Sequence, residues 1–240
     1  MNTIKLDCKN KPLMVAHRGV SGLEKENTHA AFIAAGNRSY YGIETDIHRT
    51  IDGRYVCIHD SNTKRVALDG IVVEECTFET LRKLRLCGID GQKGREDICI
   101  PSFEEYIAIC RKYEKTAVPE LKGRFTRDQV AEICEISARG EWLDRTVFIS
   151  FEIENLAFLR ELYPYQPAQF LAGENTENIC EKLNEYGLDL DISHLALTEE
   201  LADRVHADGH RINVWTVNTL TDAERAVGMG VEFITSNILE

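Results

Sequence analysis

The 240-residue sequence contains no apolar run near the roughly 18 residues that a membrane-spanning helix needs. Its opening segment, MNTIKLDCKNKPLMVAH, also lacks the sustained apolar stretch of a secretory signal peptide. Hydrophobic residues make up 43% of the chain and charged residues 28%, which is typical of globular proteins. We therefore expect a cytoplasmic protein without a membrane anchor.

The sequence is poor in positive charge, because 40 Asp and Glu outnumber 28 Lys and Arg and give a net charge of −12. Nucleic acids and anionic membrane surfaces are bound through basic patches that release counterions. We therefore expect no nucleic-acid partner. An anionic small molecule would need a local cluster of positive side chains. The sequence leaves the oligomeric state open.

Motifs for disulfides, zinc and nucleotides are missing as well. The eight cysteines are scattered and form no CxxC pair. In a chain without a secretion signal, this distribution favours buried free thiols and no zinc site. The sequence also has no GxxxxGK[ST] loop, no GxGxxG at a strand end and no GxSxG. Their absence weakens the case for nucleotide-dependent enzymes and serine hydrolases.

Short apolar runs bounded by turn-forming residues predict nine strands. These strands cover residues 13–17, 42–48, 55–60, 116–122, 146–151, 168–172, 188–193, 212–217 and 231–236. From residue 116 onward, helix-like segments or short turns separate the strands, which predicts a parallel α/β fold. The chain length suits a (β/α)₈ barrel, the TIM barrel.

Nine strands exceed the eight places in such a barrel, and the sequence contains a hairpin that can absorb the surplus. Asp52-Gly53 is a strong signal for a tight turn, so residues 42–48 and 55–60 are expected to pair antiparallel. A turn centred on these two residues would place Asp46 opposite His59.

Residues 61–101 are the least regular part of the chain. We interpret them as a small insertion between early barrel elements of a single domain, residues 1–240, with one short helix at 78–85. Ser102 with Glu105, and Thr221 with Glu224, match the capping-box spacing that marks a helix start.

Polar side chains are concentrated on one face of the predicted strand 42–48. Glu44, Asp46 and His48 have the same parity and point to one side of that strand. A solvated strand face would explain this strand taken alone. Ionisable residues also end other strands, as in His17-Arg18, His59-Asp60 and the segment 116–122. In barrel enzymes, catalytic residues gather at the carboxyl ends of several strands, so the pattern favours one converging site.

Glu44, Asp46 and Glu120 would bring three carboxylates together at that site. Two unit charges about 4 Å apart repel by about 4 kcal/mol at an effective dielectric near 20, so the cluster must hold a proton or a cation. A hard divalent ion, Mg²⁺ or Ca²⁺, is the expected cofactor. His48 is a poor ligand for these ions, and we expect it to have a hydrogen-bonding or structural role.

His17 and His59 are the candidate acid/base pair, because imidazole can accept or donate a proton near neutral pH. Arg18 has a planar fork suited to phosphate oxygens, and Lys122 adds a point charge. Taken singly, each histidine is more often structural. Together with the two cations and the metal, they predict phosphoryl chemistry on an anionic small molecule.

The sequence resembles the glycerophosphodiester phosphodiesterase family, whose barrel belongs with phospholipase-C-like phosphodiesterases. The resemblance covers nearly the whole chain through VAHRG, ENTHAAF, GIETDIHRTIDGRYVCIHD, IPSFEEYI, PELK, FISF, INVWTVN and GVEFITSN. It implies that His17 and His59 are the acid/base pair and that Glu44, Asp46 and Glu120 bind the divalent metal. It also implies that Arg18 and Lys122 hold the phosphate.

The resemblance places three further residues near the site. Glu26 and Asn27 match a loop motif of the family, although they could simply shape the loop and cap the helix that begins near Thr28. Trp215 matches an aromatic residue of the family and would form a wall for the alcohol moiety, with ordinary core packing as the alternative.

The resemblance implies hydrolysis of a small phosphodiester such as glycerophosphocholine or glycerophosphoethanolamine to sn-glycerol 3-phosphate and an alcohol. The sequence departs from the family pattern at Glu152, at the terminal TSN and across residues 61–101, which leaves the choice of alcohol open. One alternative is a lysophospholipase D or a phospholipase-C-like enzyme, although residues 61–101 contain GQKGRED rather than an apolar loop. Another is a non-catalytic phosphodiester-binding barrel, which the presence of both histidines and all three carboxylates argues against.

Overall fold

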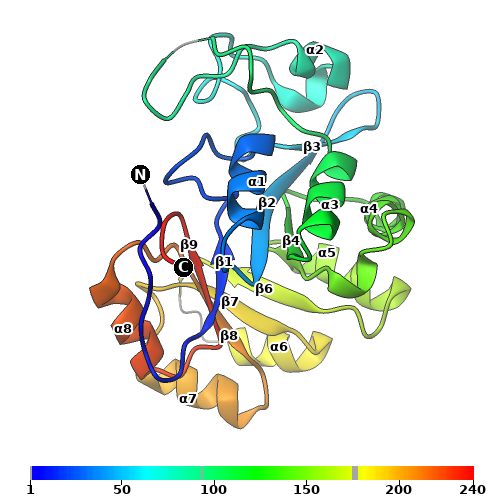
Figure 1. Ribbon diagram of the computed structural model, residues 1–240. Coiled ribbons are helices and arrows are strands. Elements are labelled where there is room, and N and C mark those ends of the chain that lie inside the picture. Colours follow the sequence, from blue (N-terminus) through cyan, green and yellow to red (C-terminus); the bar gives the residue numbers. More distant parts are fainter. Residues whose placement is uncertain (1, 93, 175–177) are drawn as a thin grey trace.

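Eight parallel strands close into a barrel in the part of the chain that the computed structural model describes, residues 2–92, 94–174 and 178–240 (Figure 1). The strand order is β1-β9-β8-β7-β6-β5-β4-β2, and pairing of β1 with β2 closes the ring. The strands are β1 (Leu13–Ala16), β2 (Gly42–Arg49), β4 (Thr116–Leu121), β5 (Phe148–Ser150), β6 (Ala168–Ala172), β7 (Asp189–Ser193), β8 (Ile212–Trp215) and β9 (Phe233–Ser236). The predicted TIM barrel is confirmed, and each strand lies within a few residues of its predicted bounds.

Helices surround the barrel (Figure 1). They are α1 (His29–Gly36), α3 (Phe103–Lys112), α4 (Arg127–Arg139), α5 (Ile153–Leu162), α6 (Ile179–Tyr186), α7 (Glu199–Ala207) and α8 (Leu220–Gly228), with a short 3-10 turn η2 (Leu143–Arg145) before β5. In α3, Phe103, Tyr106 and Cys110 are buried at helical spacing and form one apolar stripe. The Tyr106 hydroxyl joins this helix to the barrel, donating to the Ile43 carbonyl and accepting from the Val118 amide. Among the described residues, no helix combines the length and apolar character needed to cross a membrane.

One of the two predicted helix caps is present. Ser102 and Glu105 form a complete capping box at the start of α3. The prediction for Thr221 and Glu224 is wrong, because α8 begins two residues earlier, with Thr219 as its cap. Two similar patterns overlap in the segment TLTDAE, and the extended backbone that a cap requires lies at Thr219, whose side chain accepts from the Asp222 amide at 3.1 Å.

The ninth strand, β3 (Tyr55–Cys57), pairs antiparallel with β2 outside the barrel, as predicted. The predicted register is wrong by one residue, since the Ile58 amide, and not His59, bonds to the Asp46 carbonyl. The turn is longer than expected, because the Thr50 amide bonds to the Arg54 carbonyl and encloses three residues. Gly53, at φ +77°, supplies the left-handed conformation of such a loop.

The predicted insertion, residues 61–101, forms the upper part of the molecule in Figure 1. It contains a short 3-10 turn, η1 (Val73–Glu75), and the predicted helix, α2 (Phe78–Arg82), which ends earlier than expected. Val73, Leu81 and Leu86 form an apolar cluster with Val56 and Ile58 of the β3 segment, separate from the barrel core. The hairpin therefore anchors the insertion to the barrel.

All eight cysteines lie in the described part of the chain and are free thiols. Cys57, Cys110, Cys134 and Cys180 are buried, and the other four are partly exposed. The expectation of free thiols is confirmed. The expectation that they are buried is correct for Cys57, Cys110, Cys134 and Cys180 only.

Candidate active site

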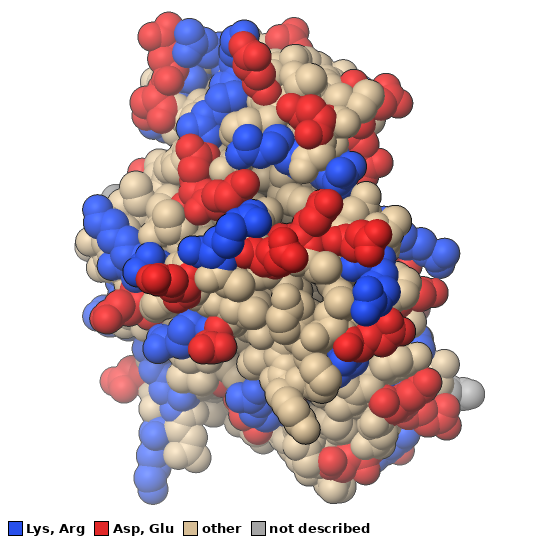
Figure 2. All heavy atoms as spheres, turned by 90° about the vertical axis from the view of Figure 1, so that its right-hand side faces the viewer, with Lys and Arg blue, Asp and Glu red and all other residues tan. Residues whose placement is uncertain are grey.

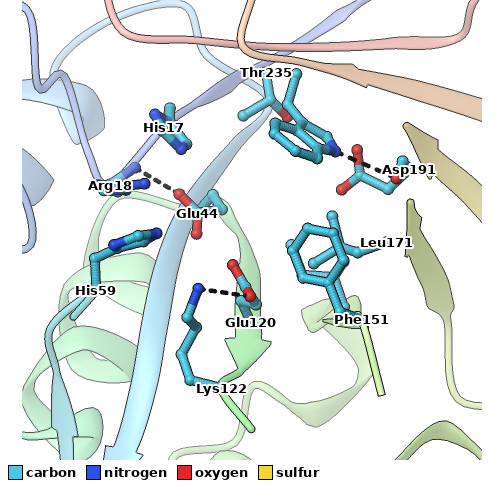
Figure 3. A pocket seen from close by; sticks show the side chains of 12 residues that line it. His17, Arg18, Glu44, His59, Glu120, Lys122, Phe151, Leu171, Asp191 and Thr235 are labelled. Atoms are coloured by element: carbon cyan, nitrogen blue, oxygen red, sulfur yellow. Dashed lines mark hydrogen bonds and ion pairs between the residues drawn. The ribbon is translucent and has the colours of Figure 1, made fainter. Parts of the chain in front are cut away.

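A pocket of about 130 Å³ opens at the carboxyl ends of the barrel strands (Figure 3). It has a charged half and an apolar half, which lie on opposite sides of the view in Figure 3. Its lining consists of His17, Arg18, Glu44, His59, Glu120, Lys122, Ile149, Phe151, Leu171, Asp191, Trp215 and Thr235. The fold therefore brings together seven of the predicted site residues.

The turn after β1 places His17 and Arg18 at the pocket. Arg18 and Gly19 both have left-handed backbones, with φ of 53° and 75°. The Arg18 amide donates to Glu44 Oε2 at 2.7 Å. A Cβ at Gly19 would lie 2.6 Å from the backbone carbonyl carbon of Ala31, so only glycine fits where the chain passes α1. The sharp turn gives both polar side chains a fixed position.

His17 is held by Asn237, which follows β9. His17 Nδ1 lies 2.7 Å from Asn237 Oδ1, and the Ser21 hydroxyl donates to the same oxygen at 2.7 Å. Because an amide oxygen only accepts, Nδ1 carries the proton and Nε2 is left as an acceptor. Burial, with a further contribution from the Arg18 charge, lowers the pKa of His17 to about 4. The imidazole is therefore neutral near pH 7.

Glu44, Asp46 and Glu120 form the predicted carboxylate cluster. They each offer an oxygen within 4.8 Å of the others, and all three are buried. Burial and the neighbouring Asp46 charge raise the pKa of Glu44 well above its usual range, and they raise that of Glu120 to about 7. For Asp46, burial alone would raise the pKa, but Arg18 and Lys122 outweigh it and lower the value to about 2.

The carboxylate cluster fits a hard divalent cation. Among the described residues, Asp46 Oδ1 is buried without a hydrogen-bond partner and has only the Lys122 ammonium 3.5 Å away, so it has a lone pair available to an ion. All three donors are carboxylate oxygens, which Mg²⁺ and Ca²⁺ prefer. Glu44, Asp46 and Glu120 could therefore hold such an ion at the pocket wall.

Arg18 and Lys122 supply positive charge beside the carboxylates. Lys122 Nζ lies 2.9 Å from Glu120 and 3.5 Å from Asp46, and Arg18 Nε lies 3.4 Å from Asp46. On the face drawn in Figure 2, basic and acidic side chains are interspersed among the described residues, without a continuous basic area. Arg18 and Lys122 thus provide two positive charges at the site, in a protein with a net charge of −12.

Glu26 and Asn27 lie behind the pocket rather than in its lining. Asn27 donates to Asp46 Oδ2 at 2.8 Å and accepts from the Thr45 hydroxyl at 2.7 Å. Glu26 pairs with Arg18 at 3.0 Å, and Thr28 caps α1. In this position the two residues shape the loop and hold Asp46 and Arg18 in place.

His59 is oriented by its neighbour in the chain. Its Nδ1 lies 2.6 Å from Asp60 Oδ1, and Arg65 of the insertion donates to Asp60 Oδ2 at 2.7 Å and to Glu26. His48 Nε2 lies 3.2 Å from the His59 carbonyl oxygen, which gives His48 the expected hydrogen-bonding role. Asp60 was visible as a charge at a strand end, whereas no sequence signal pointed to Arg65.

Ile149, Phe151, Leu171 and Trp215 form the apolar half of the pocket. The rings of Phe151 and Trp215 meet edge to face with centroids 5.8 Å apart. Trp215 thus lies in the pocket wall, and its Nε1 donates to the Asp191 carbonyl at 3.3 Å.

Asp191 and Asn237 are two further polar residues of the site that the sequence analysis did not identify. Asp191 lies in β7, and the alternation of aspartates in LDLDIS was the signal that could have revealed it. Burial raises its pKa well above the usual range, and the Glu120 charge adds to the shift. The role of Asn237 depends on a contact between the two ends of the chain, which leaves no local pattern.

Comparison with known proteins identifies the family of this chain. Residues 17–238 match the model of the Glycerophosphoryl diester phosphodiesterase family. A glycerophosphodiester phosphodiesterase of Bacillus altitudinis is 27% identical over 228 residues, covering 91% of each chain. One from Caldanaerobacter subterraneus is 27% identical over 229 residues, covering 93% of each chain.

The fold is shared with a solved phosphodiesterase of Oleispira antarctica, at 22% identity and a TM-score of 0.86. The match covers 95% of this chain and 93% of that one. The Oleispira structure was solved in complex with its product, sn-glycerol 3-phosphate.

Proposed function

This chain belongs to the glycerophosphoryl diester phosphodiesterase family and is a phosphoric diester hydrolase, and we propose that it hydrolyses small glycerophosphodiesters in a metal-dependent reaction. Its substrates would include glycerophosphocholine and glycerophosphoethanolamine, and its products sn-glycerol 3-phosphate and the free alcohol. The proposal is supported by the product that the Oleispira relative binds. Its strongest support in this chain is the pair His17 and His59 beside three carboxylates and two cations in one pocket.

His17 is suited to the role of general base. Its Nε2 has a free lone pair because Nδ1 is engaged by Asn237, and its lowered pKa keeps it unprotonated near neutral pH. It would take the proton of the substrate's own glycerol hydroxyl as that oxygen attacks phosphorus. The new P–O bond gives a cyclic phosphate, and the bond to the alcohol breaks.

His59 is suited to the role of general acid. Asp60 Oδ1 lies 2.6 Å from His59 Nδ1 and fixes the orientation of the ring, so the other ring nitrogen would give a proton to the departing alcohol oxygen. Water would then open the cyclic phosphate with the two histidines in reversed roles. Arg18 and Lys122 would bind the phosphoryl oxygens and stabilise their developing charge.

Glu44, Asp46 and Glu120 would hold one divalent ion, Mg²⁺ or Ca²⁺. The ion would supply further positive charge next to the phosphoryl oxygens, an effect worth several kcal/mol in such reactions.

The test is release of sn-glycerol 3-phosphate from glycerophosphocholine and glycerophosphoethanolamine, with added Mg²⁺ or Ca²⁺ and with chelator. We expect metal-dependent release that falls at least about 100-fold in His17→Ala and in His59→Ala. His210→Ala is the matched control, because His210 is partly exposed and bonds to Asn184 away from the pocket.

No release with any divalent metal would refute the proposed activity. Full activity in both the His17 and His59 variants would refute their roles while leaving the metal requirement to be judged separately.

A further inference from the structure

Asp191 presents an unpaired carboxyl oxygen to the pocket. The side chain points from β7 into the space that the apolar residues enclose (Figure 3). The residue is 2% exposed, and its Oδ1 has no hydrogen-bond partner among the described residues. A buried polar atom without a partner is unfavourable, so this oxygen is arranged for a ligand group that donates a hydrogen bond.

The neighbours of Asp191 in the barrel leave this oxygen free. Leu171 lies opposite it on β6 and has no polar group. Asn213, opposite it on β8, donates from its amide to Gln169 at 3.2 Å and accepts from the Thr235 hydroxyl at 3.1 Å. The Asn213 side chain also interacts with the Asp191 carboxyl group, but within the described part of the chain Asp191 Oδ1 keeps no hydrogen-bond partner.

The size and lining of the pocket limit what can reach Asp191. A cavity of about 150 Å³ accommodates a six-carbon ring, and this pocket has about 130 Å³. Such a space suits a short polyol with six heavy atoms. Leu171 and Trp215 can cover the methylene groups of the polyol, while Asp191 takes its hydroxyl.

We propose that Asp191 accepts a hydrogen bond from the terminal hydroxyl of the glycerol moiety and so selects substrates in which that hydroxyl is free. This inference rests on the proposed function. The hydroxyl next to the phosphate ester is needed for attack near His17. The terminal hydroxyl extends away from phosphorus, toward the opposite wall, where Asp191 lies. A lysophospholipid acylated at that position has no terminal hydroxyl to donate and would leave the buried Asp191 carboxyl group without that hydrogen bond.

The experiment compares glycerophosphocholine with the phosphocholine diester of propane-1,2-diol. Both keep the attacking hydroxyl and the leaving alcohol, and they differ only in the terminal hydroxyl. For the unmodified enzyme we expect kcat/KM to favour glycerophosphocholine by roughly 10- to 100-fold, because the analogue leaves a buried polar group unpaired. In Asp191→Leu the preference should fall to within about threefold, and Asp191→Asn should retain part of it.

Asp189→Asn is the matched control. Asp189 lies in the same strand, but its carboxylate pairs with Arg211 at 2.8 Å outside the pocket. This variant should keep the full preference for glycerophosphocholine.

A binding measurement separates this inference from the proposed activity. Titration calorimetry compares sn-glycerol 3-phosphate with the corresponding phosphate of propane-1,2-diol, on variants whose fold is verified by circular dichroism. If the enzyme hydrolyses neither diester, the proposed function fails, and the difference in affinity between these two monophosphates still decides the role of Asp191.

Three results would overturn the inference. One is an unchanged preference in Asp191→Leu, and another is hydrolysis of a 1-acyl lysophosphatidylcholine as fast as of glycerophosphocholine. The third is a variant that alters only the choice between choline and an uncharged leaving alcohol, since Asp191 would then contact the other end of the substrate.

Discussion

At the scale of single residues, the charged groups of the pocket shift the pKa values of one another. Asp46 remains charged because Arg18 and Lys122 lie beside it, and burial together with the Asp46 charge raises the pKa of Glu44 and Glu120. His17 is kept neutral mainly by burial, with Arg18 adding to the effect. A substitution of one group in this cluster therefore changes the pKa values of the others.

The imidazole of His17 should remain neutral down to about pH 5 in the metal-free protein, because its pKa lies near 4. Nitrogen-detected NMR of the imidazole should show Nδ1 protonated and Nε2 bare from pH 8 to pH 5. The unfolded chain binds this proton near pH 6.5, so the free energy of unfolding should fall as the pH decreases from 6.5 to 4. The slope contributed by this one group cannot exceed about 1.4 kcal/mol per pH unit.

Urea unfolding of the unmodified protein and of His17→Asn across that pH range isolates the contribution of His17. The unmodified protein should lose stability more steeply than the variant. Parallel curves, or an imidazole that titrates near pH 6.5, would contradict the assignment.

At the scale of elements, the parity of each strand decides which side chains reach the pocket. Glu44 and Asp46 on β2, Glu120 on β4 and Asp191 on β7 all point inward, while alternate residues such as Ile43 and Ile47 pack against the helices. A side-chain cap sets the start of α8. Where two cap patterns overlap, only the residue that actually caps the helix contributes the stabilising hydrogen bond.

Thr219→Ala should lower the free energy of unfolding by about 1 kcal/mol, because Thr219 caps α8. Thr221→Ala is the matched control, since Thr221 is also exposed but lies within the helix, and its effect should stay below about 0.5 kcal/mol. Chemical denaturation of both variants measures the difference. Equal losses would show that the helix start frays between the two residues.

At the scale of the whole molecule, folding assembles a charge cluster that the unfolded chain does not have. Glu44 and Asp46 come from β2 and Glu120 from β4, and the insertion contributes Arg65 to the partners of His59. Because the carboxylates meet only in the folded barrel, a cation that relieves their repulsion stabilises the folded state selectively.

Saturating Mg²⁺ or Ca²⁺ should therefore raise the unfolding temperature, and a chelator should reverse the change. At about 100 times the dissociation constant the gain is about 2.7 kcal/mol, or about 5–10 °C for a chain of this length. Affinity should increase as the pH rises through about 7, because the ion must displace the proton of Glu120. Scanning calorimetry of the unmodified protein and of Glu120→Gln provides the test, and an equal shift in both would place the ion elsewhere.

The fold and most of the site could be predicted from the local pattern of apolar, charged and turn-forming residues. Nine apolar runs specified the strands, the turn at Asp52-Gly53 separated β3 from the barrel, and charged residues at strand ends marked the pocket. The differences were small and lay in the hairpin register, in the end of α2, in the start of α8 and in the burial of four cysteines. Turn length and cap choice depend on backbone angles that residue types constrain only loosely.

Residue order alone was enough to specify the barrel and the polar character of its carboxyl-terminal face, because strand periodicity and strand ends are local properties. Three-dimensional packing was needed to join Asn237 to His17 and Arg65 to Asp60 and Glu26. It also leaves Asp191 Oδ1 without a hydrogen-bond partner in the part of the chain that the structure describes. Each of these features depends on distances between segments far apart in the chain, or on the burial that closing the barrel creates. The sequence determines which functional groups the site contains. Their hydrogen-bond partners, their pKa values and their unpaired oxygens depend on the closed barrel.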